Sequence, residues 1–374
     1  MNEKIFVIAC GGTGGHLTPG IALAEELSMR GHKCVLVVSK KAVDQKFCSA
    51  YPHFSFVQFP GIGFSKNFLS WPKFLYFLFK NFFKAVRLLK KLHPAAVIGF
   101  GGFTNASIIL SGYLLKKPCF LHEANQVVGK AIRYLSWITT KVYLPEGVSL
   151  SSISMNKQVS LGFPLIKSFQ KKDKKESCKR LNVSPYQKLL IVLGGSQGAL
   201  SFNKWVLDNF KQLALHNINV ICVTGVGKHS QQTLEISQQG VVSKVIFIPF
   251  SYDVATLFSA ADLVIGRAGA GTIAELIQCE TPSILIPYPQ AADNHQLANA
   301  LSLEQKGGCL ILEQKHMYRL LDEVLHLISN NDLLSDMRLQ LQHVQSENVA
   351  NELANDIEKT LMQLQPPSVL HFEK

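Results

Sequence analysis

Short runs of apolar, β-branched residues alternate along the chain with segments of helical periodicity. This alternation is typical of an open parallel sheet with helices on both faces. The pattern predicts nine strands, at residues 5–9, 34–38, 96–99, 119–122, 189–193, 220–224, 244–248, 263–265 and 283–286. The predicted fold class is therefore α/β.

A strand followed by a glycine turn and a helix occurs four times, as IFVIACGGTGG (5–15), AVIGFGGFTNA (96–106), LLIVLGGSQGA (189–199) and LVIGRAGAGTIAEL (263–276). The first and third copies are nearly alike and lie 183 residues apart. We therefore predict two doubly wound parallel-sheet domains, residues 1–163 and 164–346, with a hinge near residues 162–164. The lysine-rich stretch 167–188 is expected to be solvated, and the tail beyond Pro366 to be loosely held.

Composition excludes several classes of protein. The 374 residues, 47% hydrophobic and 17% charged, suffice for two globular domains and exclude a disordered chain. The eight cysteines form no CxxC pair, which leaves a zinc or redox motif unsupported and favours a reducing, cytosolic compartment. The sequence shows no signal-peptide layout and no apolar run of about 18 residues that would predict a membrane-spanning helix.

The positive charge is concentrated in the first half. Residues 1–163 hold 19 Lys and Arg against 6 Asp and Glu, a net charge of +13. Residues 164–374 hold 19 against 20, a net charge of −1. Such a surface should attract phosphates, nucleic acid or an anionic membrane.

The glycine turns suggest phosphate-containing ligands. A glycine turn between a strand and a helix exposes backbone N–H groups at the positive end of the helix. The dinucleotide pattern GxGxxG fails, because Leu17 stands where the last glycine should be. The P-loop pattern fails as well, because His229 follows Gly227 and Lys228 where Ser or Thr is needed. NAD enzymes and P-loop NTPases are therefore disfavoured.

Two ionisable residues beside these turns have alternative interpretations. His16 ends the first loop, where it could act as a general base or simply hydrogen-bond the backbone at a helix start. Glu275 is expected in the first turn of a helix, where it could complement the helix dipole or accept both hydroxyls of a ribose.

Polar residues at 293–299 could bind sugar hydroxyls or could simply be the polar side chains that are common in loops. The chain contains no DxD pair, so no carboxylate-held metal is expected.

Residues 68–92 predict a basic amphipathic helix with a wide, aromatic-rich apolar face, and Pro72 suits its first turn. A buried helix with a solvated basic stripe is the alternative. We favour contact with a membrane interface, and no nucleic-acid motif appears. The membrane-contacting residues would be Trp71, Lys73, Phe74, Phe77, Leu78, Lys80, Phe82, Lys84 and Arg87.

Taken together, six motifs resemble the MurG-type enzymes. They are GGTGGH (11–16), GGF (101–103), HEAN (122–125), GGSQG (194–198), RAGAGTIAE (267–275) and ADNHQLANA (292–300). These enzymes transfer N-acetylglucosamine from UDP-N-acetylglucosamine to lipid I and make lipid II in peptidoglycan synthesis. The resemblance implies a GT-B fold, in which two Rossmann-like domains face a cleft and a final helix, here about 347–364, returns to the first domain.

The resemblance also implies roles for single residues. His16 would be the general base, Asn125 would contact the sugar, and Glu275 would contact the ribose. The remaining substrate-binding positions would be Thr13, Gly14, Gly15, Ser196, Gln197, Gly198, Ser251, Arg267, Ala270, Gly271, Thr272, Ile273, Ala274, His295, Gln296 and Asn299. Two departures stand out: Ile166 occupies the place of a diphosphate-binding arginine, with Lys167 beside it, and Ala124 replaces a glutamine.

The implied reaction is a direct inverting displacement that needs no cofactor or metal. The implied partners are UDP-N-acetylglucosamine, lipid I, an anionic membrane surface on the cytoplasmic face of the cell membrane, and other cell-wall synthesis proteins. Three alternatives remain open at this point: a transferase for another lipid such as diacylglycerol, a UDP-sugar epimerase, and a non-catalytic UDP-sugar-binding membrane adaptor.

Overall fold

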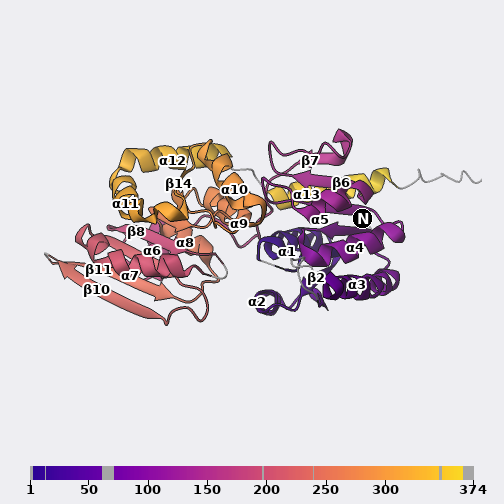
Figure 1. The fold of residues 1–374 in the computed structure, drawn as a ribbon, viewed down its shortest axis with the longest axis horizontal. Helices are drawn as coiled ribbons and strands as arrows, with labels where there is room; N and C mark the ends of the chain where they lie inside the picture. Colours follow the sequence, from indigo (N-terminus) through magenta and orange to yellow (C-terminus); the bar gives the residue numbers. More distant parts are fainter. Residues whose placement is uncertain are drawn as a thin grey trace, which may run out of the picture. The chain divides into compact units, whose positions relative to one another are not determined.

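The computed structural model describes residues 3–12, 14–60, 71–195, 198–238, 240–344 and 348–364. The chain divides into two compact units. The first comprises Met1–Ala124, Val128–Ile166 and Asn348–Lys374, and the second comprises Asn125–Val127 and Lys167–Glu347. Each unit is built on its own seven-stranded sheet (Figure 1).

The sheet of the first unit is parallel and has the order β3-β2-β1-β4-β5-β6-β7. Alternate residues of β1 enter two separate cores: Phe6 and Ile8 pack on one face, Val7 and Ala9 on the other. Burial on both faces explains the unbroken apolar runs. The strands are β1 (Ile5–Ala9), β2 (Lys33–Ser39), β3 (Ser55–Phe59), β4 (Ala96–Gly99), β5 (Cys119–His122), β6 (Lys141–Leu144) and β7 (Gln158–Ser160).

Six α-helices accompany this sheet: α1 (Gly14–Met29), α2 (Ala42–Ala50), α3 (Trp71–Leu92), α4 (Gly102–Leu114), α5 (Lys130–Leu135) and the C-terminal α13 (Val349–Gln363). Short 3₁₀ turns lie at Ser136–Ile138 and Met155–Lys157.

The C-terminal helix α13 is tied to the first unit by buried polar groups as well as by apolar packing. Arg30 at the end of α1 forms ion pairs with Glu26 and Glu358. Lys4 N–H donates to His32 Nδ1, so the opposite ring nitrogen donates to Glu358 Oε1 at 2.8 Å. Burial alone would raise the pKa of Glu358, but the hydrogen bonds from His32 and Arg30 lower it.

The sheet of the second unit has the order β10-β11-β9-β8-β12-β13-β14. Its pairs are parallel except for the antiparallel β10–β11 hairpin at one edge (Figure 1). The strands are β8 (Lys188–Leu193), β9 (Ile218–Val223), β10 (Gln232–Gln238), β11 (Val241–Ile248), β12 (Leu263–Gly266), β13 (Ser283–Leu285) and β14 (Cys309–Ile311).

The α-helices of this unit are α6 (Lys174–Arg180), α7 (Leu200–Leu215), α8 (Val254–Ala260), α9 (Ala270–Gln278), α10 (His295–Glu304), α11 (Leu320–Ser329) and α12 (Asn331–Val344). Turns of 3₁₀ helix precede α10 and α11, at Ala292–Asn294 and Gln314–Arg319.

The predicted fold class is confirmed, and each of the nine predicted strands corresponds to a strand of the structure. The pattern missed β3, β6, β7, β10 and β14. Of these, β7 and β14 have three residues each, and β10 is polar and largely exposed, so none carries a strong apolar signal.

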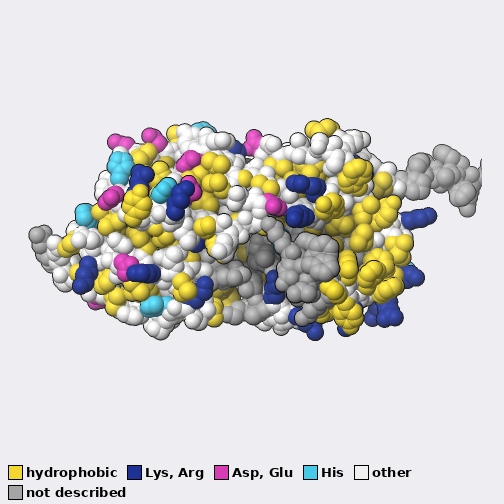
Figure 2. Space-filling view, in the orientation of Figure 1, with side chains coloured by type: hydrophobic (Ala, Val, Ile, Leu, Met, Phe, Trp, Pro, Cys, Tyr) yellow, Lys and Arg dark blue, Asp and Glu magenta, His cyan; other side chains and the backbone are white. Residues whose placement is uncertain are grey.

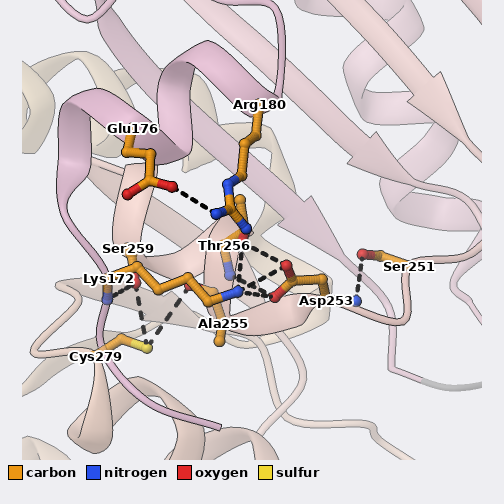
Figure 3. Close-up of polar contacts among 9 residues, drawn as sticks. All are labelled: Lys172, Glu176, Arg180, Ser251, Asp253, Ala255, Thr256, Ser259 and Cys279. Atoms are coloured by element: carbon orange, nitrogen blue, oxygen red, sulfur yellow. Dashed lines mark hydrogen bonds and ion pairs between the residues drawn. The ribbon is translucent and has the colours of Figure 1, made fainter. Parts of the chain in front are cut away.

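The lysine-rich stretch after residue 166 is paired with carboxylates rather than simply solvated. Lys172 Nζ lies 2.7 Å from both carboxylate oxygens of Asp253, and its backbone N–H donates to Ser259 Oγ (Figure 3). Lys174 Nζ lies 2.7 Å from Asp262 Oδ1, and Lys171 pairs with Glu280. These acids come from segments about 80 to 110 residues further along the chain, so local sequence does not show the pairing.

Within the part of the chain that the structure describes, none of the helices has both the length and the apolar character needed to cross a bilayer.

Candidate active site

The four glycine turns lie at the two places where the strand order reverses. In the first unit β1 lies between β2 and β4, and in the second β8 lies between β9 and β12. In open α/β sheets, ligands bind outside the carboxyl ends of the strands at such a reversal. The four copies of the strand–glycine–helix pattern follow β1, β4, β8 and β12. The sheet topology therefore gathers the repeated motif into one candidate site in each unit.

The first glycine loop is held tightly against β2. A methyl group on Gly11 would lie 2.3 Å from the backbone nitrogen of Ser39, so only glycine fits there. The buried Asp44 carboxylate accepts from the N–H groups of Gly12 at 3.0 Å and Ser39 at 2.8 Å. Lys41 Nζ donates to Gly12 O at 2.8 Å. Thr13 lies outside the described residues.

Asp44 and Lys41 are loop-positioning residues that the sequence reasoning missed. Only their spacing after β2 could have pointed to them.

We expect Asp44→Ala to lower the free energy of unfolding by about 2 kcal/mol, because it leaves two buried N–H groups without an acceptor. Asp44→Asn keeps one acceptor oxygen and should cost less. Urea denaturation of both variants checks this, and equal stabilities of wild type and Asp44→Ala would contradict it.

His16 lies in the first turn of α1, against the glycine turn that follows β4. A Cβ atom on Gly101 would lie 3.0 Å from His16 Nε2, and one on Gly102 would lie 3.3 Å from Nδ1. Thr104 Oγ1, near the start of α4, donates to Gly11 O at 3.0 Å. The imidazole is therefore placed where the amino ends of α1 and α4 meet, and the exposed Gly15 precedes it. Helix amino ends favour anionic groups.

In the second unit, the loop after β8 leads into α7. Gly195 and Gly198 have positive φ angles, and a Cβ atom on Gly198 would lie 2.2 Å from Thr224 O. Helix α7 begins after Ala199 with no side-chain cap and no acid in its first turn, so the positive end of its dipole is not blocked by a capping side chain. Ser196 and Gln197 lie outside the described residues.

Glu275 lies in the second turn of α9, not in the first turn as expected. The helix starts at Ala270, five residues earlier, because Gly269 is its N-cap. Glu275 is therefore further from the helix end than the dipole interpretation needs. Burial raises the pKa of its carboxyl to about 8. The residues from the helix start to this position are all partly exposed, namely Ala270, Gly271, Thr272, Ile273, Ala274 and Glu275.

Asn299 is 4% exposed, and its side-chain amide forms hydrogen bonds to other groups of the protein. Its Oδ1 accepts from Gln126 N–H at 2.8 Å, and its Nδ2 donates to Asn125 Oδ1 and to Ala268 O, each at 3.1 Å. Asn299 thereby holds Asn125 beside the loop after β12. This geometry favours a positioning role over direct contact with a sugar.

Arg267 is also used for internal contacts. Its Nη1 donates to Ile286 O at 3.0 Å, and its Nη2 donates to Gln314 Oε1 at 2.6 Å. The guanidinium lies 4.5 Å from the centre of the Phe202 ring and 5.4 Å from that of Tyr288, and burial lowers its pKa. Arg267 therefore holds the loop after β12 against the end of β13.

The other predicted residues of this unit follow β11 and β13: Ser251 lies on the loop after β11, and His295 and Gln296 begin α10, which follows the loop after β13. Ser251 Oγ accepts from Asp253 N–H at 3.2 Å (Figure 3). Gln296 Oε1 accepts from Tyr288 N–H at 2.9 Å, and His295 Nδ1 lies 2.7 Å from Ala292 O. These loops follow the carboxyl ends of parallel strands, as those after β8 and β12 do, so the structure places them along one edge of the sheet.

Comparison with known proteins identifies the family. The model of the glycosyltransferase family 28 N-terminal domain matches residues 6–144, and that of the C-terminal domain matches residues 189–354. The UDP-N-acetylglucosamine–N-acetylmuramyl-(pentapeptide) pyrophosphoryl-undecaprenol N-acetylglucosamine transferase of Opitutus terrae is 43% identical over 355 residues, which cover 95% of this chain and 94% of that protein. The chain belongs to the MurG family, within glycosyltransferase family 28.

A second relative and a solved structure agree with this assignment. The transferase of the same name from Thermodesulfovibrio yellowstonii is 31% identical, with 89% of this chain and 92% of that protein covered. The crystal structure of Acinetobacter baumannii MurG superposes with a TM-score of 0.72 at 24% identity, covering 96% of this chain and all of that one. The fold is GT-B, with two Rossmann-like domains.

Proposed function

We propose that this MurG-family enzyme transfers N-acetylglucosamine from UDP-N-acetylglucosamine to the 4-hydroxyl of N-acetylmuramic acid in lipid I, with lipid II and UDP as products. The observation that carries the proposal is the 43% identity over nearly the whole length of both chains. The glycine turns at both strand-order reversals support it, because they suit a phosphate-containing donor and acceptor.

In this proposal the second unit binds the donor. The loop at residues 194–198 and the amino end of α7 hold the diphosphate, with Ser196, Gln197 and Gly198 on this loop. Residues 270–275 surround the nucleotide, and Glu275 accepts from the ribose hydroxyls. The loop at Ser251 lies at the uracil. Asn125, held by Asn299, contacts the sugar together with His295 and Gln296.

The first unit supplies the base and receives the acceptor. His16, or a water that it orients, takes the proton from the attacking hydroxyl, which then displaces UDP from the anomeric carbon with inversion. Thr13, Gly14 and Gly15 lie beside this base in the sequence. The N–H groups of the second unit's loops stabilise the charge that develops on the departing diphosphate.

The direct test is incubation of the purified chain with radiolabelled UDP-N-acetylglucosamine and lipid I in detergent micelles, followed by chromatography of the lipid fraction. We expect label in lipid II and equimolar UDP. A parallel reaction with diacylglycerol identifies a different lipid specificity, and release of free N-acetylmannosamine identifies an epimerase. Binding of the donor without any transfer would leave a non-catalytic protein and would overturn the proposal.

We propose further that α3 holds the first unit on an anionic membrane. Three aromatic residues at helical spacing are exposed on α3: Tyr76, Phe79 and Phe83, of which the last two are 61% and 60% exposed. Exposed cations accompany them, including Lys80 and Arg87. Figure 2 shows hydrophobic and basic side chains together over this part of the first unit. Aromatic rings and cations on one face suit the headgroup region of a bilayer.

The exposed face of α3 differs in detail from the expectation. Ser107 and Ser111 of α4 donate to the carbonyl oxygens of Leu78 and Phe82, so the side of α3 that carries these two residues faces α4. Lys84 Nζ donates to Gln58 O at 2.6 Å, so one of its three N–H donors is bonded within the first unit. Phe77, Leu78 and Phe82 are half-buried, whereas the side chains of Trp71, Lys73 and Phe74 lie outside the described residues.

We expect the double variant Phe79→Ser and Phe83→Ser to bind vesicles of anionic lipid at least about tenfold more weakly, because each ring contributes roughly 1.5–3 kcal/mol when buried. Sedimentation with phosphatidylglycerol vesicles measures this. Tyr186→Ser, at a residue 89% exposed in the second unit, is the matched control and should bind as wild type does. Equal binding of the double variant and wild type would contradict the membrane role of α3.

A further inference from the structure

The place of a diphosphate-binding cation is taken by an apolar residue in this chain. The resemblance to the MurG family led us to expect an arginine at position 166, where the sequence has isoleucine. In the structure Ile166 packs against the apolar core of the first unit. The diphosphate of UDP-N-acetylglucosamine carries two negative charges, and this position supplies no countercharge to them.

A different cation lies on the loop that we assign to the diphosphate. Lys228 Nζ donates to Gly198 O at 3.1 Å. Gly198 is the last glycine of the loop after β8, and Lys228 comes from the loop after the neighbouring strand β9. The ammonium group therefore lies at the carboxyl end of β8, beside the amino end of α7.

The turn that carries Lys228 is closely packed against the loop after β8. Lys228 N–H donates to Gly225 O at 3.2 Å and closes the turn. Gly225 has a φ angle of 92°, which favours glycine, and the backbone at Thr224 leaves no room for a side chain on Gly198. The buried Asn203 of α7 donates to Thr224 O at 3.1 Å. Contacts of Gly198, Thr224 and Asn203 therefore join the end of the loop after β8 to the loop after β9 and to α7.

Lys228 forms no ion pair with the described residues. In the described residues no carboxylate lies within 4 Å of it, whereas Lys172, Lys174 and Lys204 each pair with an aspartate. Lys228 is exposed to solvent, and its ammonium group donates one hydrogen bond to the Gly198 carbonyl oxygen, which leaves two N–H donors for a ligand. The first turn of α7 contains no acid that would repel an anion.

We propose that Lys228 binds the diphosphate of the sugar-nucleotide donor at the loop of residues 194–198 and supplies the cation that Ile166 does not. This role rests on the proposed function of the second unit as the donor-binding unit. It also gives Lys228 a part in departure of UDP, because the ammonium group faces the charge that grows on the leaving diphosphate.

Calorimetry with uridine, UDP and UDP-N-acetylglucosamine tests this role. For Lys228→Gln we expect affinity for UDP and UDP-N-acetylglucosamine to fall about tenfold, as for loss of one charge-assisted hydrogen bond at an exposed site, with affinity for uridine unchanged. Lys228→Arg should keep most of the affinity. Lys211→Gln, an exposed lysine further along α7, is the matched control and should behave as wild type does.

Four outcomes would overturn the role of Lys228. Lys228→Gln with wild-type affinity for UDP would do so, and so would a loss of uridine affinity equal to the loss for UDP, since that result indicates a damaged loop. A loss in Lys167→Gln but not in Lys228→Gln would assign the cation to Lys167 instead. If wild type transfers the sugar and Lys228→Gln binds UDP as tightly as wild type does, the role of Lys228 is wrong and the proposed function still stands. Wild-type protein that binds no UDP would overturn both.

Discussion

Replacement of His16 by alanine is expected to lower kcat roughly 100- to 10,000-fold, the usual contribution of a general base. Affinity for UDP-N-acetylglucosamine should stay unchanged, because the donor loops belong to the second unit and His16 belongs to the first. The imidazole lies against Gly101 and Gly102 at the amino ends of two helices, where an attacking hydroxyl of a phosphate-linked acceptor would be held. Steady-state kinetics with both substrates, together with donor calorimetry, measures the two effects separately.

The substitution Gly101→Ala should displace the His16 imidazole without replacing His16 itself. The new methyl group would lie 3.0 Å from His16 Nε2, on a residue whose φ angle of 95° is strained for alanine. We expect a loss of kcat in this variant as well, with donor binding retained. A folded His16→Ala enzyme with full turnover would remove His16 from the chemistry.

Replacement of Glu275 by glutamine is expected to weaken donor binding by roughly tenfold or more and to remove its pH dependence. Burial raises the pKa of Glu275 to about 8, so much of the free protein carries a neutral carboxyl at neutral pH. The carboxylate form accepts from both ribose hydroxyls, whereas the acid form keeps one oxygen as a donor. Binding of the sugar nucleotide therefore favours ionisation of Glu275, and wild-type affinity should rise with pH up to about 8 and level off above it.

The same carboxyl has the opposite effect on the stability of the free protein. Between its ordinary pKa of 4.5 and about 8, the folded state holds a proton that the unfolded chain has released. The contribution of Glu275 to the free energy of unfolding therefore falls as the pH rises through this window. Glu275→Gln should lack this decline in urea titrations across the same window.

A donor analogue distinguishes ribose contact from an indirect effect of Glu275. The 2′-deoxyribose form of UDP-N-acetylglucosamine should bind wild type more weakly than the natural donor does. Glu275→Ala should bind the two donors equally, because the partner of the missing hydroxyl is gone. If Glu275→Ala still discriminates between them as wild type does, the ribose contact is wrong.

The fold was largely predictable, because its signal is local. Buried parallel strands such as 5–9 and 96–99 are continuous apolar runs, and a glycine turn follows each of the two. Strands with few apolar residues were missed, as β10 shows with its alternation of exposed polar positions. The position of Glu275 was misjudged by a turn, because the helix begins at Ala270 and the sixth helical residue already lies in the second turn.

The sequence motifs named candidate site residues but not the contacts that those residues make. The motifs pointed to His16, Asn125 and Glu275, and the roles of these three residues stay proposals. No sequence pattern indicates that Asn299 holds Asn125 or that Arg267 is surrounded by carbonyl oxygens and rings. Nor does one indicate that Lys228, considered only as part of a failed P-loop pattern, lies on Gly198.

The amino-acid sequence by itself determined the alternation of strands and helices, the four glycine turns and the excess of positive charge in the first half. Each of these is a property of neighbouring residues or of composition. The tertiary structure determines which turns share a strand-order reversal, which polar side chains are hydrogen-bonded inside the protein and which lysine lies on the loop after β8. Those outcomes depend on contacts between residues far apart in the chain, such as Arg30 with Glu358 and Lys228 with Gly198, and local patterns do not contain them.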